Sequence, residues 1–171
     1  ERLFIQWGYS QIFPSKTLCA HVTTWNRGTS IKFRTDVAMM CKLGFDIKLE
    51  DMNQNEHLYC DQAVKNYNRL KPVILEGDLY RLVSPYGSNH TSSIFAFDIH
   101  PRYAEKTLPV RLQGLNADKK YRVKEINMMP GSGSSLKGNN QVFSGEYLMN
   151  VGLDLFTTQQ LNSRLIEITE E

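Results

Sequence analysis

One stretch decides the fold of this chain: Arg34-Thr35-Asp36-Val37-Ala38-Met39-Met40-Cys41-Lys42-Leu43-Gly44-Phe45-Asp46-Ile47-Lys48-Leu49. Between residues 37 and 41 the apolar side chains recur at the spacing of a helix. Gly44 then predicts the end of that helix in a left-handed turn. From residue 45 to 49 apolar and charged side chains alternate, which predicts a strand. The order of helix, glycine and strand is typical of an α/β barrel or a doubly wound sheet.

The flanking segments continue this alternation of helices and strands. Residues 2–12 place apolar side chains at helical spacing, and residues 19–24 form a short apolar run that suits a parallel strand covered on both faces. Residues 53–76 predict a long helix that starts with an Asn53–Glu56 capping box and stops at Gly77. Its apolar stripe consists of Tyr59, Ala63, Tyr67, Leu70 and Ile74. Pro72 lies inside this pattern and predicts a kink.

From residue 78 onward the pattern changes to short strand-like runs separated by turns. The six runs are residues 79–83, 93–99, 108–112, 121–126, 146–151 and 163–168. No helix pattern lies between them, so we expect an antiparallel sandwich or barrel. Residues 129–141 are rich in Gly, Ser and Asn and predict a mobile loop.

The chain is therefore expected to be an α+β protein of two domains. Residues 1–78 contain two strands and three helices, whereas a (β/α)8 barrel has eight of each. We interpret them as the tail of an incomplete (β/α)8 barrel. Residues 79–171 are expected to form an antiparallel β-sandwich.

Composition excludes several function classes. The formal charge of +2 is too small to indicate binding to nucleic acid or to an acidic membrane surface. No apolar run reaches the roughly 18 residues of a membrane span. No leader pattern is present, and because Glu1 is not a start residue we expect the true N-terminus to be missing; the compartment stays open between cytoplasm and periplasm.

Three cysteines, Cys19, Cys41 and Cys60, are scattered and odd in number. This spacing predicts neither a disulfide framework nor a metal motif, so we interpret them as small core residues. His57, His90 and His100 have no second ligand at metal spacing. We therefore expect no metal and no cofactor.

At the level of ordered motifs, the chain resembles the α-galactosidases of glycoside hydrolase family 36. The first part of the resemblance is carried by Glu1-Arg2-Leu3-Phe4-Ile5-Gln6-Trp7-Gly8-Tyr9-Ser10, Phe13-Pro14, Ala20-His21-Val22, Asp36-Val37-Ala38-Met39 and Leu43-Gly44-Phe45-Asp46. It continues through Gly77-Asp78-Leu79-Tyr80-Arg81-Leu82, Ser84-Pro85, Arg111-Leu112-Gln113-Gly114-Leu115 and Tyr121-Arg122-Val123. Each motif is short, but their order and spacing together cover nearly the whole chain.

The resemblance implies strand seven of the barrel at residues 19–24 and strand eight at residues 44–49. It also implies a retaining hydrolase of α-linked galactosides in which one aspartate attacks the anomeric carbon and another serves as acid and base. Both aspartates would lie upstream of Glu1. This chain would then be an inactive C-terminal part of an enzyme that needs no cofactor.

Four candidate substrate-binding residues follow the first barrel strand: His21, Trp25, Asn26 and Arg27. The carboxyl ends of barrel strands face the active site, and an indole, an amide and a guanidinium suit a sugar ring. The alternative is that His21 bonds inside the barrel and Trp25 packs. The loop departs from the Pro-Asn-His-Gln-like loop that is usual in the family. Asp36, which would complement a helix dipole, and Asp46, expected in mid-strand, are not expected to form a catalytic pair.

A second function class remains open, a non-catalytic sandwich module that binds carbohydrate or supports a neighbouring domain. Its aromatic platform would draw on Tyr80, Tyr86, Phe95, Phe97 and Tyr103. Because Phe95 and Phe97 share one face, we interpret them as core residues. The first half is also expected to expose apolar surface, including Phe4, Trp7 and the stripe on residues 53–76. A second copy of the chain would cover this surface, unless the β half folds back over it.

Overall fold

The computed structural model describes residues 1–25, 28–77, 91–102, 107–157 and 159–171. The chain divides into two compact units: Glu1–Leu79 with Asn127–Ser132, and Tyr80–Ile126 with Gly133–Glu171. The expected domain boundary after residue 78 stays a prediction. The first compact unit, however, also includes residues 127–132, the short segment that follows the strand ending at Ile126.

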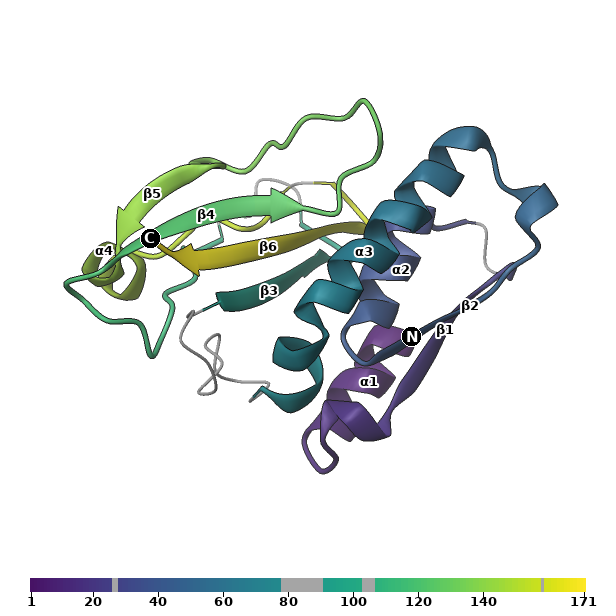
Figure 1. The fold of residues 1–171 in the computed structure, drawn as a ribbon, viewed down its shortest axis with the longest axis horizontal. Helices are drawn as coiled ribbons and strands as arrows, with labels where there is room; N and C mark the ends of the chain where they lie inside the picture. Colours follow the sequence, from purple (N-terminus) through teal and green to yellow (C-terminus); the bar gives the residue numbers. More distant parts are fainter. Residues whose placement is uncertain (26–27, 78–90, 103–106, 158) are drawn as a thin grey trace. The chain divides into compact units, whose positions relative to one another are not determined.

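The first unit is built on two parallel strands. Its elements are α1 (Arg2–Ser10), the 3-10 helix Ser15–Thr17, β1 (Cys19–Thr23), α2 (Ile31–Met39), β2 (Lys42–Asp46), the 3-10 helix Leu49–Asp51 and α3 (Gln54–Glu76) (Figure 1). β1 and β2 pair in parallel with Ala20 opposite Leu43. α2 connects the two strands and packs against both of them and against α3, which makes a βαβ unit.

Gly44 does not end a helix, contrary to the sequence-based expectation. α2 ends at Met39, and Gly44 lies inside β2 directly opposite His21. A Cβ atom at Gly44 would lie 2.2 Å from Cδ2 of His21, so the glycine makes room for the imidazole ring. The strand consequently starts at Lys42 instead of residue 45, and Asp46 is its last residue.

The long helix α3 follows the prediction closely. The amide of Glu56 donates to Oδ1 of Asn53 at 3.0 Å, and the amide of Asn53 donates to Oε2 of Glu56 at 2.9 Å. The helix runs as one element through Pro72 to Glu76 and is capped by Gly77. All residues of the expected apolar stripe are buried: Tyr59, Ala63, Tyr67, Leu70 and Ile74. The expectation that this stripe adds to an exposed patch is therefore wrong.

α1 does expose apolar side chains. Phe4 is 64% exposed and Trp7 is 54% exposed, and Gln6 is the buried residue of this helix. β1 alternates as well, with Ala20 and Val22 buried and His21 exposed. The strand is thus covered on one face, not on both as its apolar run suggested.

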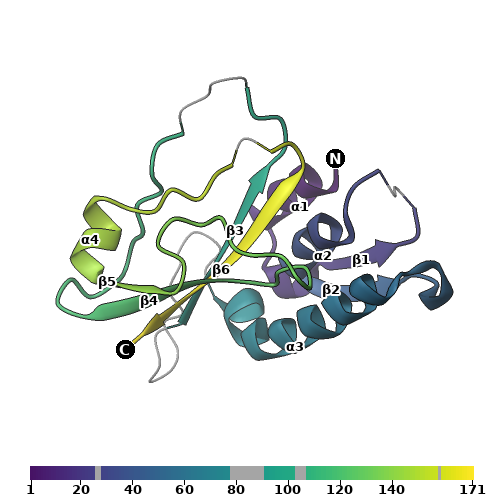
Figure 2. The same ribbon diagram turned by 90° about the horizontal axis from the view of Figure 1, so that it is seen from above.

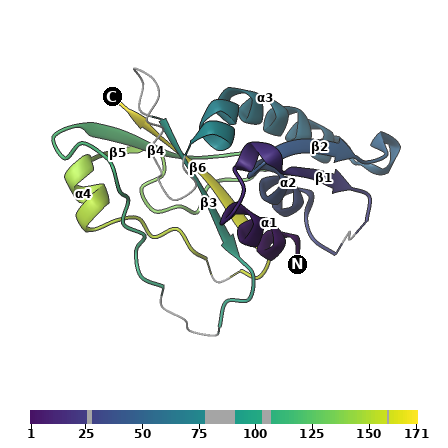
Figure 3. The ribbon, with the colours of Figure 1, turned by 90° about the horizontal axis from the view of Figure 1, so that it is seen from below.

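The second unit contains a single antiparallel sheet among the described residues. Its elements are β3 (Thr91–Asp98), β4 (Lys120–Ile126), β5 (Gln141–Ser144), α4 (Gly145–Asn150) and β6 (Asn162–Glu170), and the strand order is β3-β6-β4-β5 (Figure 1). β3 and β6 lie side by side along their whole length (Figure 3). The predicted strand at residues 79–83 lies outside the described residues. The chain is thus a mixed α/β protein with an antiparallel sheet.

Two of the predicted strands have a different structure. Residues 146–151 were expected to be a strand, but α4 occupies them, next to β5 (Figure 2). Ser144 caps this helix, because its Oγ accepts from the amide of Tyr147 at 3.1 Å. Residues 108–112 contribute only an isolated bridge between Val110 and Leu153. An apolar run of six residues cannot by itself distinguish a strand from a short capped helix.

One face of this sheet carries the core of the second unit. The buried core consists of Ile94, Ala96, Leu112, Leu115, Tyr121, Val123, Leu136, Leu148, Leu153, Leu155, Ile166 and Ile168. Phe95 and Phe97 point to the other face and are half-buried, so their interpretation as core residues is wrong. Strand alternation placed them together correctly, but it does not tell which face is covered.

Residues 133–141 of the Gly- and Ser-rich segment are anchored within the second unit, whereas residues 129–132 belong to the first. Leu136 is buried in the core, and Nη2 of Arg164 donates to Oγ of Ser135 at 2.6 Å. Ser134 donates to the buried carboxylate of Glu125. Composition predicted a mobile loop, whereas these long-range contacts hold it on the sheet.

Candidate functional site

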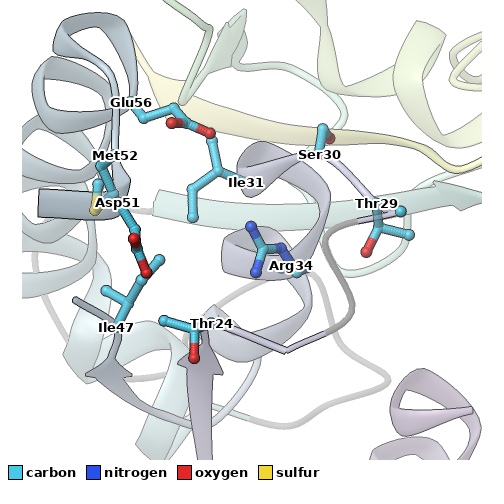
Figure 4. Close-up of a pocket in the computed structure, with 10 residues that line it drawn as sticks. Thr24, Thr29, Ser30, Ile31, Arg34, Ile47, Asp51, Met52 and Glu56 are labelled. Carbon is cyan, nitrogen blue, oxygen red and sulfur yellow. The ribbon is translucent and has the colours of Figure 1, made fainter. Parts of the chain in front are cut away.

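A polar pocket of about 240 Å³ lies at the carboxyl ends of β1 and β2. Thr24 follows the last residue of β1, and Ile47 follows the last residue of β2 (Figure 4). The lining residues are Thr24, Gly28, Thr29, Ser30, Ile31, Arg34, Ile47, Asp51, Met52 and Glu56. Ligands of α/β proteins bind at this end of parallel strands, so the pocket is the candidate site.

One wall of the pocket is the start of α2. Oγ of Ser30 accepts from the amide of Phe33 at 3.1 Å and so caps the helix. Arg34 follows one turn later, and its Nη1 donates to the backbone carbonyl of Thr23 at 2.6 Å and to that of Trp25 at 3.4 Å. The helix and the end of β1 are therefore tied together on both sides of Thr24.

The opposite wall comes from the segment after β2. Asp51 and Met52 lie at the end of the second 3-10 helix, and Glu56 belongs to the first turn of α3 (Figure 4). The pocket thus joins hydroxyl groups, one guanidinium and two carboxylates with the apolar side chains of Ile31 and Ile47. Such a mixture of donors and acceptors suits a small polyhydroxylated ligand.

Asp36 lies outside this pocket, in a closed network. It is 0% exposed, and its carboxylate accepts from Nζ of Lys32 at 2.6 Å and from the hydroxyl of Tyr59 at 3.2 Å. The amide of Asn127 donates to the same carboxylate and, at 2.7 Å, to the hydroxyl of Tyr59. Burial, with the charge of Asp36 next in importance, raises the pKa of Tyr59 well above its ordinary value. Asp36 therefore binds structural donors, and no solvent or substrate reaches it.

Of the four predicted substrate-binding residues, the structure describes His21 and Trp25, and neither lines the pocket. His21 lies exposed in mid-strand beside Gly44, with its carbonyl accepting from Arg2, and does not line the pocket. Trp25 is 82% exposed and adjoins Thr24 in the chain. Asn26 and Arg27 lie outside the described residues, as do His90, Tyr80, Tyr86 and Tyr103.

Sequence reasoning missed three pocket residues: Arg34, Asp51 and Glu56. Glu56 was predicted as a capping residue, which it also is, and the sequence patterns assigned no site role to Arg34 or Asp51. Their common signal was position, because each follows closely on one of the two parallel strands. Asp46 was expected in mid-strand, but it is the exposed last residue of β2 and does not line the pocket.

The remaining candidates behave as ordinary surface or core groups. His57 is exposed, and Nδ1 of His100 lies 2.8 Å from the side-chain nitrogen of Gln160. Cys41 is buried, but Cys19 is exposed, so its interpretation as a core residue is wrong. Across the part of the chain that the structure describes, no three His, Cys, Asp or Glu side chains gather as a metal site would require. None of the helices in that part is long and apolar enough to cross a bilayer.

Comparisons with known proteins define the class. The family description "Glycosyl hydrolase family 36 C-terminal domain" matches residues 83–168, and "Melibiase" matches residues 1–77. The chain therefore belongs to glycosyl hydrolase family 36. Both halves match in the order that the ordered motifs implied.

Curated relatives agree with this assignment, and solved structures share the fold. Alpha-galactosidase 2 of Hypocrea jecorina is 28% identical over 188 residues, which cover 100% of this chain and 23% of the relative. Probable alpha-galactosidase G of Emericella nidulans is 29% identical, over 100% of this chain and 24% of the relative. The fold is similar to that of a variant of the GH36 α-galactosidase AgaA from Geobacillus stearothermophilus in complex with stachyose, with a TM-score of 0.76, 24% identity and coverage of 99% of this chain and 24% of that chain. The chain thus spans about a quarter of the length of the relatives that it matches.

Proposed function

We propose that this chain forms the C-terminal part of an α-galactosidase that hydrolyses α-linked galactosides by a retaining mechanism. Residues 1–78 would be the end of a (β/α)8 catalytic barrel and residues 79–171 a C-terminal β-sandwich domain. Both catalytic aspartates would lie in the upstream part of the enzyme. The chain would supply one wall of the sugar site and perform no hydrolysis by itself.

The observation that carries this proposal is the pocket at the carboxyl ends of β1 and β2. In a (β/α)8 barrel all substrate-binding loops lie at that end of the strands. Two parallel strands connected by α2 are the repeating unit of such a barrel. Hydroxyl, guanidinium and carboxylate groups in the pocket would bind the hydroxyls of a galactose ring.

Neither Glu56 in the pocket nor the buried Asp36 outside it is a candidate nucleophile. A retaining pair needs carboxyl groups ~5–5.5 Å apart across the scissile bond, one of which must attack freely. Glu56 is engaged in the cap of α3, and Asp36 is enclosed by Lys32, Tyr59 and Asn127. We therefore expect the purified chain to release no nitrophenol from nitrophenyl α-galactoside. Turnover that survives Asp36→Asn and Asp46→Asn would contradict the proposal.

Binding tests the positive part of the proposal. Galactose should shift the backbone amide resonances of Thr24, Ser30 and Arg34 in ¹⁵N-labelled chain, and glucose, its C4 epimer, should shift them less. If both sugars leave the pocket resonances unchanged at high millimolar concentration, the pocket does not bind galactose in this chain.

A second function, a sugar-binding module without catalysis, is favoured by one observation in the second unit. The rings of Phe143 and Tyr147 stack with centroids 5.2 Å apart, and Tyr147 is 41% exposed. An exposed tyrosine ring offers a face to a pyranose ring. Galactose-induced shifts at Tyr147, with none at Thr24 and Arg34, would favour this module over the barrel wall.

A further inference from the structure

We infer that Arg34 is a positioning residue that holds Trp25 at the pocket as a stacking surface for the sugar ring. The inference rests on the proposed function, because it names the group that would contact the galactoside. It is carried by the backbone contacts of Arg34 together with the exposure of Trp25.

Arg34 fixes the chain on both sides of a pocket-lining residue. Its Nη1 donates to the carbonyl of Thr23 at 2.6 Å and to the carbonyl of Trp25 at 3.4 Å. These two carbonyls flank Thr24, which lines the pocket together with Arg34 itself. Thus one guanidinium sets the path of the chain as it leaves β1.

The guanidinium is attached to a rigid base. α2 is capped by Ser30, and the residues before and after Arg34, Phe33 and Thr35, are buried. An arginine stays protonated at all ordinary pH values and presents several donors in a planar fork. Lysine offers a compact ammonium on a flexible stem, so it would hold one of the two carbonyls less well.

Trp25 combines a tied backbone with an open side chain. Its carbonyl accepts from Arg34, whereas 82% of its surface is exposed. Burial of so large an apolar ring is favourable, and an indole left open next in the chain to the pocket residue Thr24 offers a flat face to the C–H side of a sugar. The fixed backbone limits the region that the indole can sample, which lowers the entropic cost of binding.

A purely structural role for Arg34 predicts a different outcome. Arg2 provides the matched case, because its Nη1 donates to the carbonyl of His21 on the same strand. If such contacts only stabilise β1, replacing either arginine should change stability and nothing else. If Arg34 positions Trp25, only its replacement should change the environment of that indole.

Tryptophan fluorescence distinguishes the two roles. The chain has two tryptophans, so Trp7→Phe leaves Trp25 as the single reporter. In this background we would compare Arg34→Met, Arg34→Lys and the control Arg2→Met by steady-state anisotropy and by iodide quenching. Thermal unfolding of each variant shows that it is folded, and Arg34→Lys keeps the test usable if Arg34→Met does not fold.

We expect Arg34→Met to lower the anisotropy of Trp25, Arg34→Lys to restore part of it, and Arg2→Met to leave it unchanged. Galactose should quench Trp25 in the parent, with an apparent affinity about 10-fold lower in Arg34→Met, since the charge-assisted hydrogen bonds that fix the chain on both sides of Thr24 are lost. Equal anisotropy in the parent and in folded Arg34 variants would overturn the positioning role. An anisotropy loss without any galactose response in the parent would instead overturn the sugar-binding function of the site.

Discussion

The two units bury apolar surface to different extents. In the second unit, the inner face of the sheet is closed by α4 and by the segments that carry Leu112, Leu136 and Leu155. In the first unit, α1 exposes Phe4 and Trp7, and β1 exposes every other side chain. Exposed apolar surface of this kind marks an interface. One face of the sheet in the second unit is thus closed over its own core, whereas α1 of the first unit leaves large apolar side chains exposed, and we expect further protein to cover them.

Each of the two units nevertheless contains a buried carboxylate that is bound by donors from other segments of the chain. The carboxylate of Asp36 in the first unit accepts a hydrogen bond from the side-chain amide of Asn127, 91 residues away. Glu125 in the second unit lies 3.8 Å from Nε of Arg164 and accepts from Ser134. A buried charge is tolerated only when it is paired and hydrogen-bonded, so each network fixes its segments in one arrangement.

The largest expected effect contrasts one isoleucine in each unit. Ile166→Ala removes a side chain that is 0% exposed in the closed core, and it should lower the free energy of unfolding by ~2–5 kcal/mol. Ile5→Ala removes a side chain that is 50% exposed, and it should change stability by less than ~0.5 kcal/mol. Urea unfolding monitored by circular dichroism measures both. Equal losses would show that α1 is covered in solution.

The Asp36 network is tested by replacing Asn127 with aspartate, which has nearly the same shape as asparagine but carries a negative charge. Asn127→Asp places a carboxylate against Asp36 and should cost about 3 kcal/mol at neutral pH, because one buried charge is left without its donor. Asn140→Asp is the matched control: both asparagines have a positive φ, 61° and 60°, but Asn140 is exposed. Chemical unfolding should show a loss for Asn127→Asp alone. A tolerated Asn127→Asp would mean that residues 127–132 do not complete the first unit.

The apolar surface of α1 is tested through self-association. We expect the dilute chain to bind a hydrophobic dye and to associate, since its exposed rings gain by being covered. Phe4→Ser with Trp7→Ser should weaken both properties without lowering the unfolding midpoint. Light scattering over a range of concentrations decides the matter. A monomer at every concentration, with no dye bound, would contradict association through this surface.

The smallest effect is a pH dependence in the first unit. Burial, the larger influence, together with the nearby charge of Glu56 raises the pKa of Cys60 from 9.0 to about 11. The unfolded thiol then releases its proton at lower pH than the folded thiol, so stability falls as pH rises from about 9 to 11. Because the thiol is only half-buried, we discount the effect to about 1 kcal/mol. Cys60→Ala should remove this part of the pH profile. Unfolding midpoints at pH 8.5 and pH 11 measure the difference.

The sequence by itself determined the local elements whose signals lie within a few residues. The Asn53–Glu56 capping box and the stripe from Tyr59 to Ile74 specified α3, and alternating apolar residues specified β3, β4 and β6. The ordered motifs also determined the family. Caps and periodicity suffice there because they act through neighbouring residues.

Only the tertiary structure determined the position of Gly44 in a strand, the helix α4, the pocket and the partners of Asp36. Gly44 is a strand residue because the ring of His21 lies over it, and residues 146–151 form α4 because Ser144 caps them and Leu148 reaches the core. The pocket joins Thr24, which follows β1, with Arg34 of α2 and Glu56 of α3. The donors of Asp36 come from positions 32, 59 and 127. A short apolar run is compatible with either a helix or a strand, and a polar side chain acquires its partner only when distant segments pack together, so a local pattern could not specify these features.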